Sequence, residues 1–262
     1  MVAIPCGFDP RFRHHTDGTP EPLSEGVPVF SAKTERSIVT MSGYDRMGSY
    51  VLKKLGEGYR INKLDIGADA ELSKSGMRFS TSCYEVEGLG RLCIMTMNAM
   101  MGLMKMETVV LSAFTKDAPL LNLDWVTAMG KETFMAEFYD CCLSPLPEAL
   151  GAAYAAIKAK DADIPEYESG PHWYDDIKLP FSYGKTGKGY SQRFTEAGRA
   201  YFDEYMRQLE LLADCGAEAK AEKVRGFAET LFKNGGPAVD QVKKLFGDET
   251  AQRLIVKHMY GC

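Results

Sequence analysis

The sequence predicts an α+β fold, an α/β/α sandwich in which a central antiparallel sheet is flanked by helices. Segments of alternating apolar and polar residues follow one another through residues 76–141 with only short connections between them. Parallel neighbours would need crossover helices, so such segments indicate an antiparallel meander. From residue 147 onward, the apolar residues recur at helical spacing instead. Strands followed by helices are typical of a sheet that helices cover on one or both faces.

The alternating and the helical spacing of apolar residues predict the following elements in chain order. A helix is expected over 41–55, where Gly56 ends it. Five strands are then expected at 76–86, 92–97, 107–114, 120–128 and 133–141. The later helices are expected at 147–160, at 194–215 with Thr195 as N-cap, and at 217–233, 237–246 and 249–259.

Length and composition indicate one ordinary globular domain over residues 1–262, with residues 1–36 as an irregular N-terminal arm rich in Pro, Gly and polar groups. Of the 262 residues, 45% are hydrophobic and 26% are charged, which excludes a disordered or fibrous chain. The first fifteen residues lack the unbroken apolar run of a signal peptide. The apolar stretch at 92–104 is too short to span a bilayer. The sequence therefore predicts a cytoplasmic protein with no membrane partner.

Charge and cysteine content exclude some classes of partner and ligand. A net charge of −5 argues against nucleic-acid binding through a basic surface. Residues 161–176 carry acids without Lys or Arg, whereas 178–199 carry five basic residues against Glu196. Both stretches can be solvated loops, or the second can be a basic patch for an acidic partner or an anionic ligand. The seven cysteines form no CxxC pair or zinc spacing, so no bound metal is predicted.

Two acids inside apolar strands are the strongest candidates for chemistry. Asp124 shares a strand face with Asn122 and Val126 in the segment LLNLDWV, and Glu107 begins the strand ETVVLSAF. A carboxyl group in a sheet is costly unless it is paired or protonated. Burial would raise its pKa toward the range in which it can give or take protons near neutrality. Alternatively, each carboxylate faces solvent or is hydrogen-bonded to a neighbouring loop.

The stretch between Glu107 and Asp124, which contains Asp117-Ala118-Pro119-Leu120, resembles the central strands of the ferredoxin-dependent bilin reductases. In that family an Asp-x-Pro loop leads into a strand whose aspartate protonates the bilin, and Asp124 falls on that aspartate. Glu107 falls on a strand position that holds histidine or asparagine. The segments 140–145 (DCCLSP), Phe181-Ser182 and 243–261 are similar to later family motifs. The related red chlorophyll catabolite reductases share the scaffold.

The resemblance implies an oxidoreductase that reduces a linear tetrapyrrole and holds no organic cofactor. Reduced ferredoxin, or flavodoxin, would supply the electrons as an external partner, and acidic side chains would supply protons. Asp124 would be the proton donor and Glu107 an assisting acid, on a sheet face shared with Asn122 and Val126. The methionines of 95–106 would line the ligand or pack as ordinary core. The cations implied for the ligand propionates, or for docking ferredoxin, are Lys185, Lys188 and Arg193.

Two alternatives remain open. The family's glutamate on the second strand is met here by Met95, and its aspartate before the last helices falls near Asn234-Gly235-Gly236, where no carboxylate stands. A non-catalytic tetrapyrrole-binding protein on the same scaffold would fit these departures. The other alternative is an enzyme that acts on an anionic metabolite at the 182–189 loop, SYGKTGKG, although this loop lacks the first glycine of a phosphate-binding loop.

Overall fold

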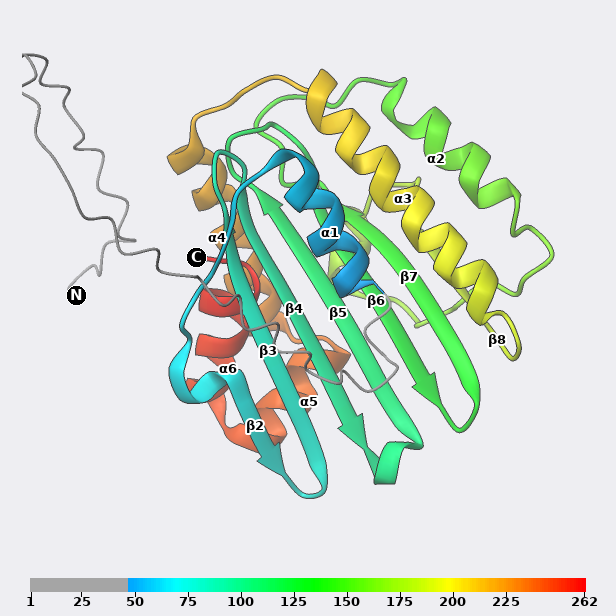
Figure 1. Cartoon of the computed structure of the whole chain (residues 1–262), viewed down its shortest axis with the longest axis vertical. Helices are drawn as coiled ribbons and strands as arrows, with labels where there is room; N and C mark the ends of the chain where they lie inside the picture. Colours follow the sequence, from blue (N-terminus) through cyan, green and yellow to red (C-terminus); the bar gives the residue numbers. More distant parts are fainter. Residues whose placement is uncertain (1–46) are drawn as a thin grey trace, which may run out of the picture. The chain divides into compact units, whose positions relative to one another are not determined.

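A computed structural model describes residues 47–262, all of which lie within one compact unit of the chain (Figure 1). The predicted α+β fold with a central antiparallel sheet between helices is confirmed. The predicted irregular arm at 1–36 lies outside the described residues, as do the first residues of the helix predicted at 41–55.

The sheet has eight strands, all paired antiparallel in the order β1-β3-β4-β5-β6-β7-β8, with β2 also paired to β3. Its strands are β1 (Ile61–Lys63), β2 (Glu71–Lys74), β3 (Met77–Val86), β4 (Gly90–Ala99), β5 (Met104–Ala113), β6 (Leu120–Ala128), β7 (Lys131–Tyr139) and β8 (Tyr183–Gly187). The five predicted strands are β3 to β7, and they form the predicted meander. The short strands β1, β2 and β8 were not predicted from the sequence.

The helices are α1 (Gly48–Gly58), α2 (Leu150–Ala159), α3 (Ser191–Leu211), α4 (Ala217–Asn234), α5 (Pro237–Phe246) and α6 (Asp248–Gln252), which continues as a π-helix (Arg253–Met259). Helix α3 begins four residues before the predicted N-cap. Thr195 therefore lies inside the helix, where its hydroxyl donates to the carbonyl of Ser191 at 2.8 Å. No helix within residues 47–262 has the length and apolar character needed to cross a membrane.

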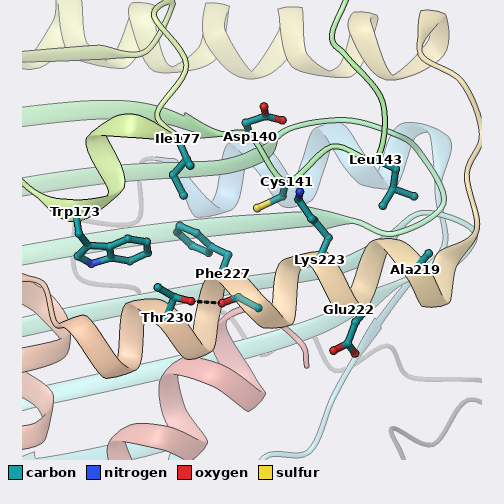
Figure 2. A pocket seen from close by; sticks show the side chains of 11 residues that line it. Asp140, Cys141, Leu143, Trp173, Ile177, Ala219, Glu222, Lys223, Phe227 and Thr230 are labelled. Carbon is teal, nitrogen blue, oxygen red and sulfur yellow. Dashed lines mark hydrogen bonds between the residues drawn. The ribbon is translucent and has the colours of Figure 1, made fainter.

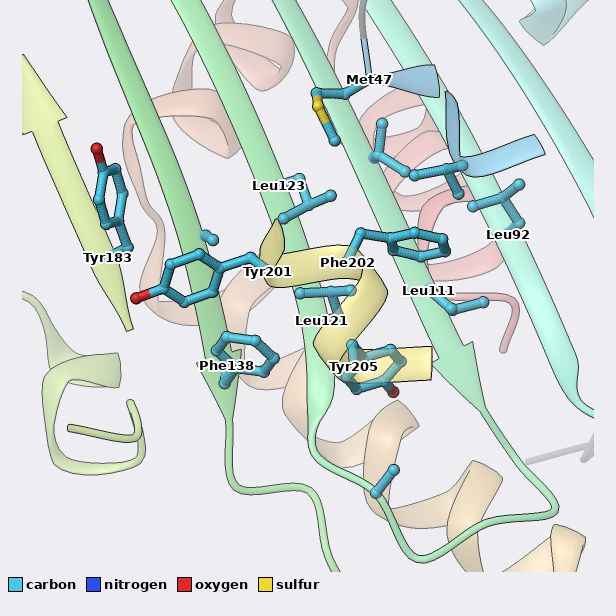
Figure 3. Packing of buried hydrophobic residues seen from close by; sticks show 14 of the residues in the cluster. Met47, Leu92, Leu111, Leu121, Leu123, Phe138, Tyr183, Tyr201, Phe202 and Tyr205 are labelled. Atoms are coloured by element: carbon cyan, nitrogen blue, oxygen red, sulfur yellow. The ribbon is translucent and has the colours of Figure 1, made fainter. Parts of the chain in front are cut away.

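Each face of the sheet has its own hydrophobic core. Helices α1, α2 and α3 cover one face, and α4, α5, α6 and the π-helix cover the other (Figure 1). On the first face, aromatic side chains of α3 pack against β6 and β7, with the ring centroids of Phe138 and Tyr205 6.1 Å apart (Figure 3). The strand period of two places Leu121 and Leu123 on this face and Asp124 on the other.

The second core does not bury its whole sheet face equally. Its apolar side chains, such as Met95 and Val110, pack fully against the C-terminal helices. Toward the turns at 100–103 and 129–130, several side chains of this face become half-buried, while Thr108 and Asn122 stay buried. We call this region the Asp124 face, and it comprises Met106, Thr108, Asn122, Asp124, Val126, Met135 and Glu137.

Candidate functional site

Asp124 stands in a row of side chains that crosses the sheet on its second face. Antiparallel pairing places one residue from each of six strands in this row: Thr81, Met95, Thr108, Asp124, Met135 and Gly184. Within this row, Asp124 is the one group with an ionisable carboxyl. The chain therefore presents a single acid among uncharged neighbours at this level of the sheet.

The two carboxyl oxygens of Asp124 accept hydrogen bonds from its nearest neighbours. The hydroxyl of Thr108 donates to Oδ1, and Nδ2 of Asn122 donates to Oδ2 at 2.6 Å. Burial, together with the charge of Glu137, raises the pKa of Asp124 to about 7 although the bonds from Thr108 and Asn122 oppose the shift. A carboxyl group with this pKa holds its proton in about half of the molecules at neutral pH, which suits a proton donor.

Asn122 adds an unused acceptor beside this acid. Its side chain is only 9% exposed, and within the described part of the chain its Oδ1 has no hydrogen-bond partner. A buried carbonyl oxygen without a partner costs about 1–3 kcal/mol. Asn122 therefore contributes to the site through its Nδ2, which donates to Asp124.

Glu137 on strand β7 is a second acid near Asp124. It lies opposite Asn122 in the register of β6 and β7 and therefore shares the face of Asp124. Its carboxylate accepts a hydrogen bond from the hydroxyl of Tyr139 at 2.7 Å and lies 3.6 Å from Nζ of Lys178. Neither Glu137 nor Thr108 was predicted as a site residue from the sequence. Reading the strand period across paired strands would have found them, because both flank the position of Asp124.

The predicted placement of Glu107 on the face of Asp124 is wrong. Glu107 pairs with Trp125, so it lies on the first face, under helix α1. There its carboxylate accepts hydrogen bonds from the backbone N–H groups of Met47, at 3.1 Å, and Gly48, at 2.9 Å. Glu107 thus holds the N-terminus of α1, where a negative charge also complements the helix dipole. The side chain that does face Asp124 on β5 is its neighbour Thr108.

Replacing Glu107 with alanine is therefore expected to destabilise the fold and to leave the titration of Asp124 unchanged. Two buried N–H groups lose their acceptor, and each unsatisfied group costs about 1–3 kcal/mol. Urea denaturation should show a lower free energy of unfolding, and an activity assay at a temperature where the variant is folded should show the wild-type pH profile. A shift of that profile would mean that Glu107 acts on the site after all.

Two of the three predicted cations form ion pairs away from the face of Asp124. Lys185 is 2% exposed on the first face, where its Nζ donates to the carbonyl of Ile164 at 2.9 Å and to Glu166 at 2.7 Å. Arg193 binds Asp161 and Asp163. Neither side chain reaches the face of Asp124, so the prediction that they bind the ligand there is wrong. Both lock the segment before β8 onto the first face.

Three further predictions concern Lys188, Val126 and the 182–189 segment. Lys188 is exposed in the turn after β8, and its role in binding stays a prediction. Val126 lies half-buried on the Asp124 face as predicted. The 182–189 segment is largely the edge strand β8, and its Lys185 is buried in an ion pair. This arrangement contradicts an anion site built on Lys185.

Some of the methionines predicted to line the ligand are buried in the core, and others are exposed at the surface. Met95 and Met97 are buried in the second core, and Met104 and Met106 are half-buried against it. Met100 and Met101 are exposed in the turn between β4 and β5. Met104 and Met106 are therefore the half-buried methionines of this run, and both lie on the same side of β5 as Thr108.

A separate groove of about 610 Å³ lies beside helix α4 (Figure 2). Its walls include Trp173 and Ile177 on one side and Phe227 and Lys223 of α4 on the other. The ring of Phe227 packs on that of Tyr139 with the centroids 4.9 Å apart. The groove thus adjoins the far side of the tyrosine that donates to Glu137, while Asp124 does not line it.

Comparison with known proteins identifies a shared fold. No family model matches the sequence, and no curated protein matches it either. A solved structure, phytochromobilin synthase from tomato in complex with biliverdin, matches with a TM-score of 0.68 and 10% sequence identity. The match covers 83% of this chain and 82% of that chain. This chain therefore has the fold of a bilin reductase, which confirms the fold implied by the resemblance of the central strands.

Proposed function

We propose that this protein is an oxidoreductase that binds a linear tetrapyrrole and reduces it with electrons from ferredoxin or flavodoxin. One observation carries the proposal: a half-buried carboxyl group with a pKa of about 7, Asp124, stands on the sheet of a fold shared with a protein solved in complex with biliverdin. A proton-giving group at this position suits a ligand that must take up protons as it takes up electrons.

The proposed reaction saturates one double bond of the tetrapyrrole, which takes up two electrons and two protons. Two molecules of the reduced donor protein each give one electron and are oxidised in turn. One proton comes from the carboxyl of Asp124, which becomes a carboxylate and recovers a proton from water. The second proton comes from water. Asn122 would hold the carboxyl of Asp124 in place beside the ligand by donating from its Nδ2.

An anaerobic titration of the full chain with biliverdin, followed by absorbance, tests the proposal. We expect a shifted spectrum on binding, and loss of the long-wavelength band when reduced ferredoxin is added. Ferredoxin with biliverdin but without the protein is the control for direct reduction. An unchanged spectrum in a large excess of biliverdin would contradict both binding and catalysis.

The same row of side chains also favours a second candidate, a non-catalytic tetrapyrrole carrier. Met95 and Thr108, the neighbours of Asp124 on β4 and β5, are not titratable. A site with one acid can hold a ligand through hydrogen bonds without being able to supply both protons quickly. A shifted spectrum that persists unchanged with reduced ferredoxin and with reduced flavodoxin would identify the carrier.

A further inference from the structure

We propose that Glu137 controls when Asp124 holds its proton, and that Lys178 limits this control by neutralising Glu137. The inference deepens the proposed function and rests on it for its role in turnover. Glu137 acts here as a positioning residue, because it works through Asp124 rather than on the ligand. Neither Glu137 nor Lys178 belongs to the motifs that carry the resemblance of the sequence to the bilin reductases.

Strand register places the two carboxyl groups close together. Asp124 pairs with Met135, and Asn122 pairs with Glu137, so Glu137 is the diagonal neighbour of Asp124 on the same face. Diagonal neighbours on adjacent strands have Cα atoms about 7–8 Å apart, and their side chains are within reach of each other. Two like charges at this separation, beside a buried core, disfavour simultaneous ionisation.

Two polar groups contact the carboxylate of Glu137. The hydroxyl of Tyr139 donates to one oxygen at 2.7 Å, and Nζ of Lys178 lies 3.6 Å from the other. Lys178 also pairs with Asp175 at 3.0 Å, so its charge is divided between two carboxylates. The side chain of Lys178 is 27% exposed. Lys178 therefore neutralises Glu137 only in part, and a residual negative charge acts on Asp124.

The other titratable groups around the pair are neutral tyrosines. Burial raises the pKa of Tyr139 and of Tyr260 well above its usual value, and Glu137 contributes to both shifts. Burial and Glu137 also raise the pKa of Tyr174. All three rings hold their protons across the physiological range. Among the described residues, the charge that acts on Asp124 is thus that of Glu137, whose ion-pair partner Lys178 is shared with Asp175.

The structure predicts opposite effects for two substitutions. Glu137→Gln removes the negative charge, so Asp124 should lose its proton at lower pH than in the wild type. Lys178→Met leaves Glu137 uncompensated, so Asp124 should keep its proton to higher pH. We expect each midpoint to move by about one pH unit, which is an about tenfold change in the fraction of protonated Asp124 at high pH.

The test is a pH titration of the full chain without ligand, following the carboxyl carbon resonances of ¹³C-labelled aspartate by NMR. Asp124→Asn identifies the resonance of Asp124 by its loss. The matched control is Glu132→Gln, which removes the same charge from the same strand. Glu132 lies on the opposite face and accepts a hydrogen bond from Ser191 at 2.5 Å. We expect this control to leave the midpoint of Asp124 unchanged.

Single-turnover rates across pH then separate this inference from the proposed function. Midpoints that move in opposite directions in Glu137→Gln and Lys178→Met, with rate profiles that follow them, support both. A midpoint of Asp124 that stays unchanged in both variants overturns the inference, even if the wild type reduces the ligand. Opposite NMR shifts in a protein that reduces no tetrapyrrole support control of Asp124 by Glu137 and reject the proposed function instead.

Discussion

Replacing Asp124 with asparagine is expected to lower the rate of tetrapyrrole reduction by about 100-fold to 10,000-fold, the range for loss of a general acid. Asparagine keeps the size and polarity of the side chain and can still bond to Thr108 and Asn122. It has no proton to give near neutral pH. Biliverdin binding, followed by absorbance, should therefore stay close to that of the wild type while single-turnover reduction slows.

Wild-type rates should also fall as pH rises above about 7, because Asp124 must be protonated to act. The residual rate of Asp124→Asn should not fall in this way as pH rises.

The pH dependence of stability gives an independent check on the state of Asp124. Since burial raises the pKa of Asp124 above its unfolded value, the stability that this group contributes is lost as pH rises from about 4 to about 7. The asparagine variant should lose less over that interval. A wild-type rate in Asp124→Asn would sink the assignment of the proton donor.

Strand periodicity explains why the centre of the fold is predictable from the sequence. The segment LLNLDWVTA alternates between two faces that both become cores, and β6 spans the predicted residues 120–128. Edge strands carry weaker patterns. Strand β1 has only three residues and none is fully buried, and the residues that β8 buries (Tyr183, Lys185 and Thr186) form no apolar alternation, so neither sequence differs visibly from a loop. Pairing with β3 and β7, rather than local sequence, makes them strands.

The candidate site is only partly predictable, and the reason lies in register. Asp124, Asn122 and Val126 were placed correctly on one face because they belong to one strand. Glu107 was misplaced because assigning its face requires the pairing of β5 with β6, and a shift of one residue exchanges the two faces of a strand. Because of this one-residue difference, Thr108, which does face Asp124 on β5, was not predicted.

Buried cations were missed for a different reason. Lysines are rarely buried, so Lys185 was predicted to bind an outside anion and Lys220 attracted no prediction. Their partners, Glu166 and Asp117, are distant enough in sequence that no local pattern connects them. The ion pairs exist because tertiary packing brings α4 onto the loop before β6, and the segment before β8 onto the sheet.

Lys220 of α4 holds the loop that precedes the strand of Asp124. Its Nζ donates to the carbonyl of Ala118 at 2.6 Å and to that of Cys141 at 2.7 Å, and it pairs with Asp117 at 3.2 Å. The side chain is 1% exposed. Asp117 also accepts from the backbone N–H of Leu143 at 2.7 Å. A single buried cation therefore joins α4 to the chain segments on either side of β6 and β7.

Replacing Lys220 with alanine is expected to destabilise the protein by about 3–5 kcal/mol, because it leaves Asp117 as an uncompensated buried charge. Urea denaturation of Lys220→Ala measures this loss. Adding Asp117→Asn to the variant should recover part of it, since the unpaired charge is then absent. Without such recovery, the loss would come from the two carbonyl groups, Ala118 and Cys141, rather than from the ion pair.

The pH dependence of this loss tests the electrostatic cause separately. Although burial opposes the shift, the N–H of Leu143 and the charge of Lys220 hold the pKa of Asp117 below its usual value. The stability from the pair is therefore present above the unfolded pKa and is lost as pH falls through the folded pKa. The difference between the wild type and Lys220→Ala should shrink as pH falls, because Asp117 becomes protonated at higher pH in the variant than in the wild type. A difference that stays constant to low pH would show that Lys220 stabilises the fold mainly by bonding the two carbonyl groups.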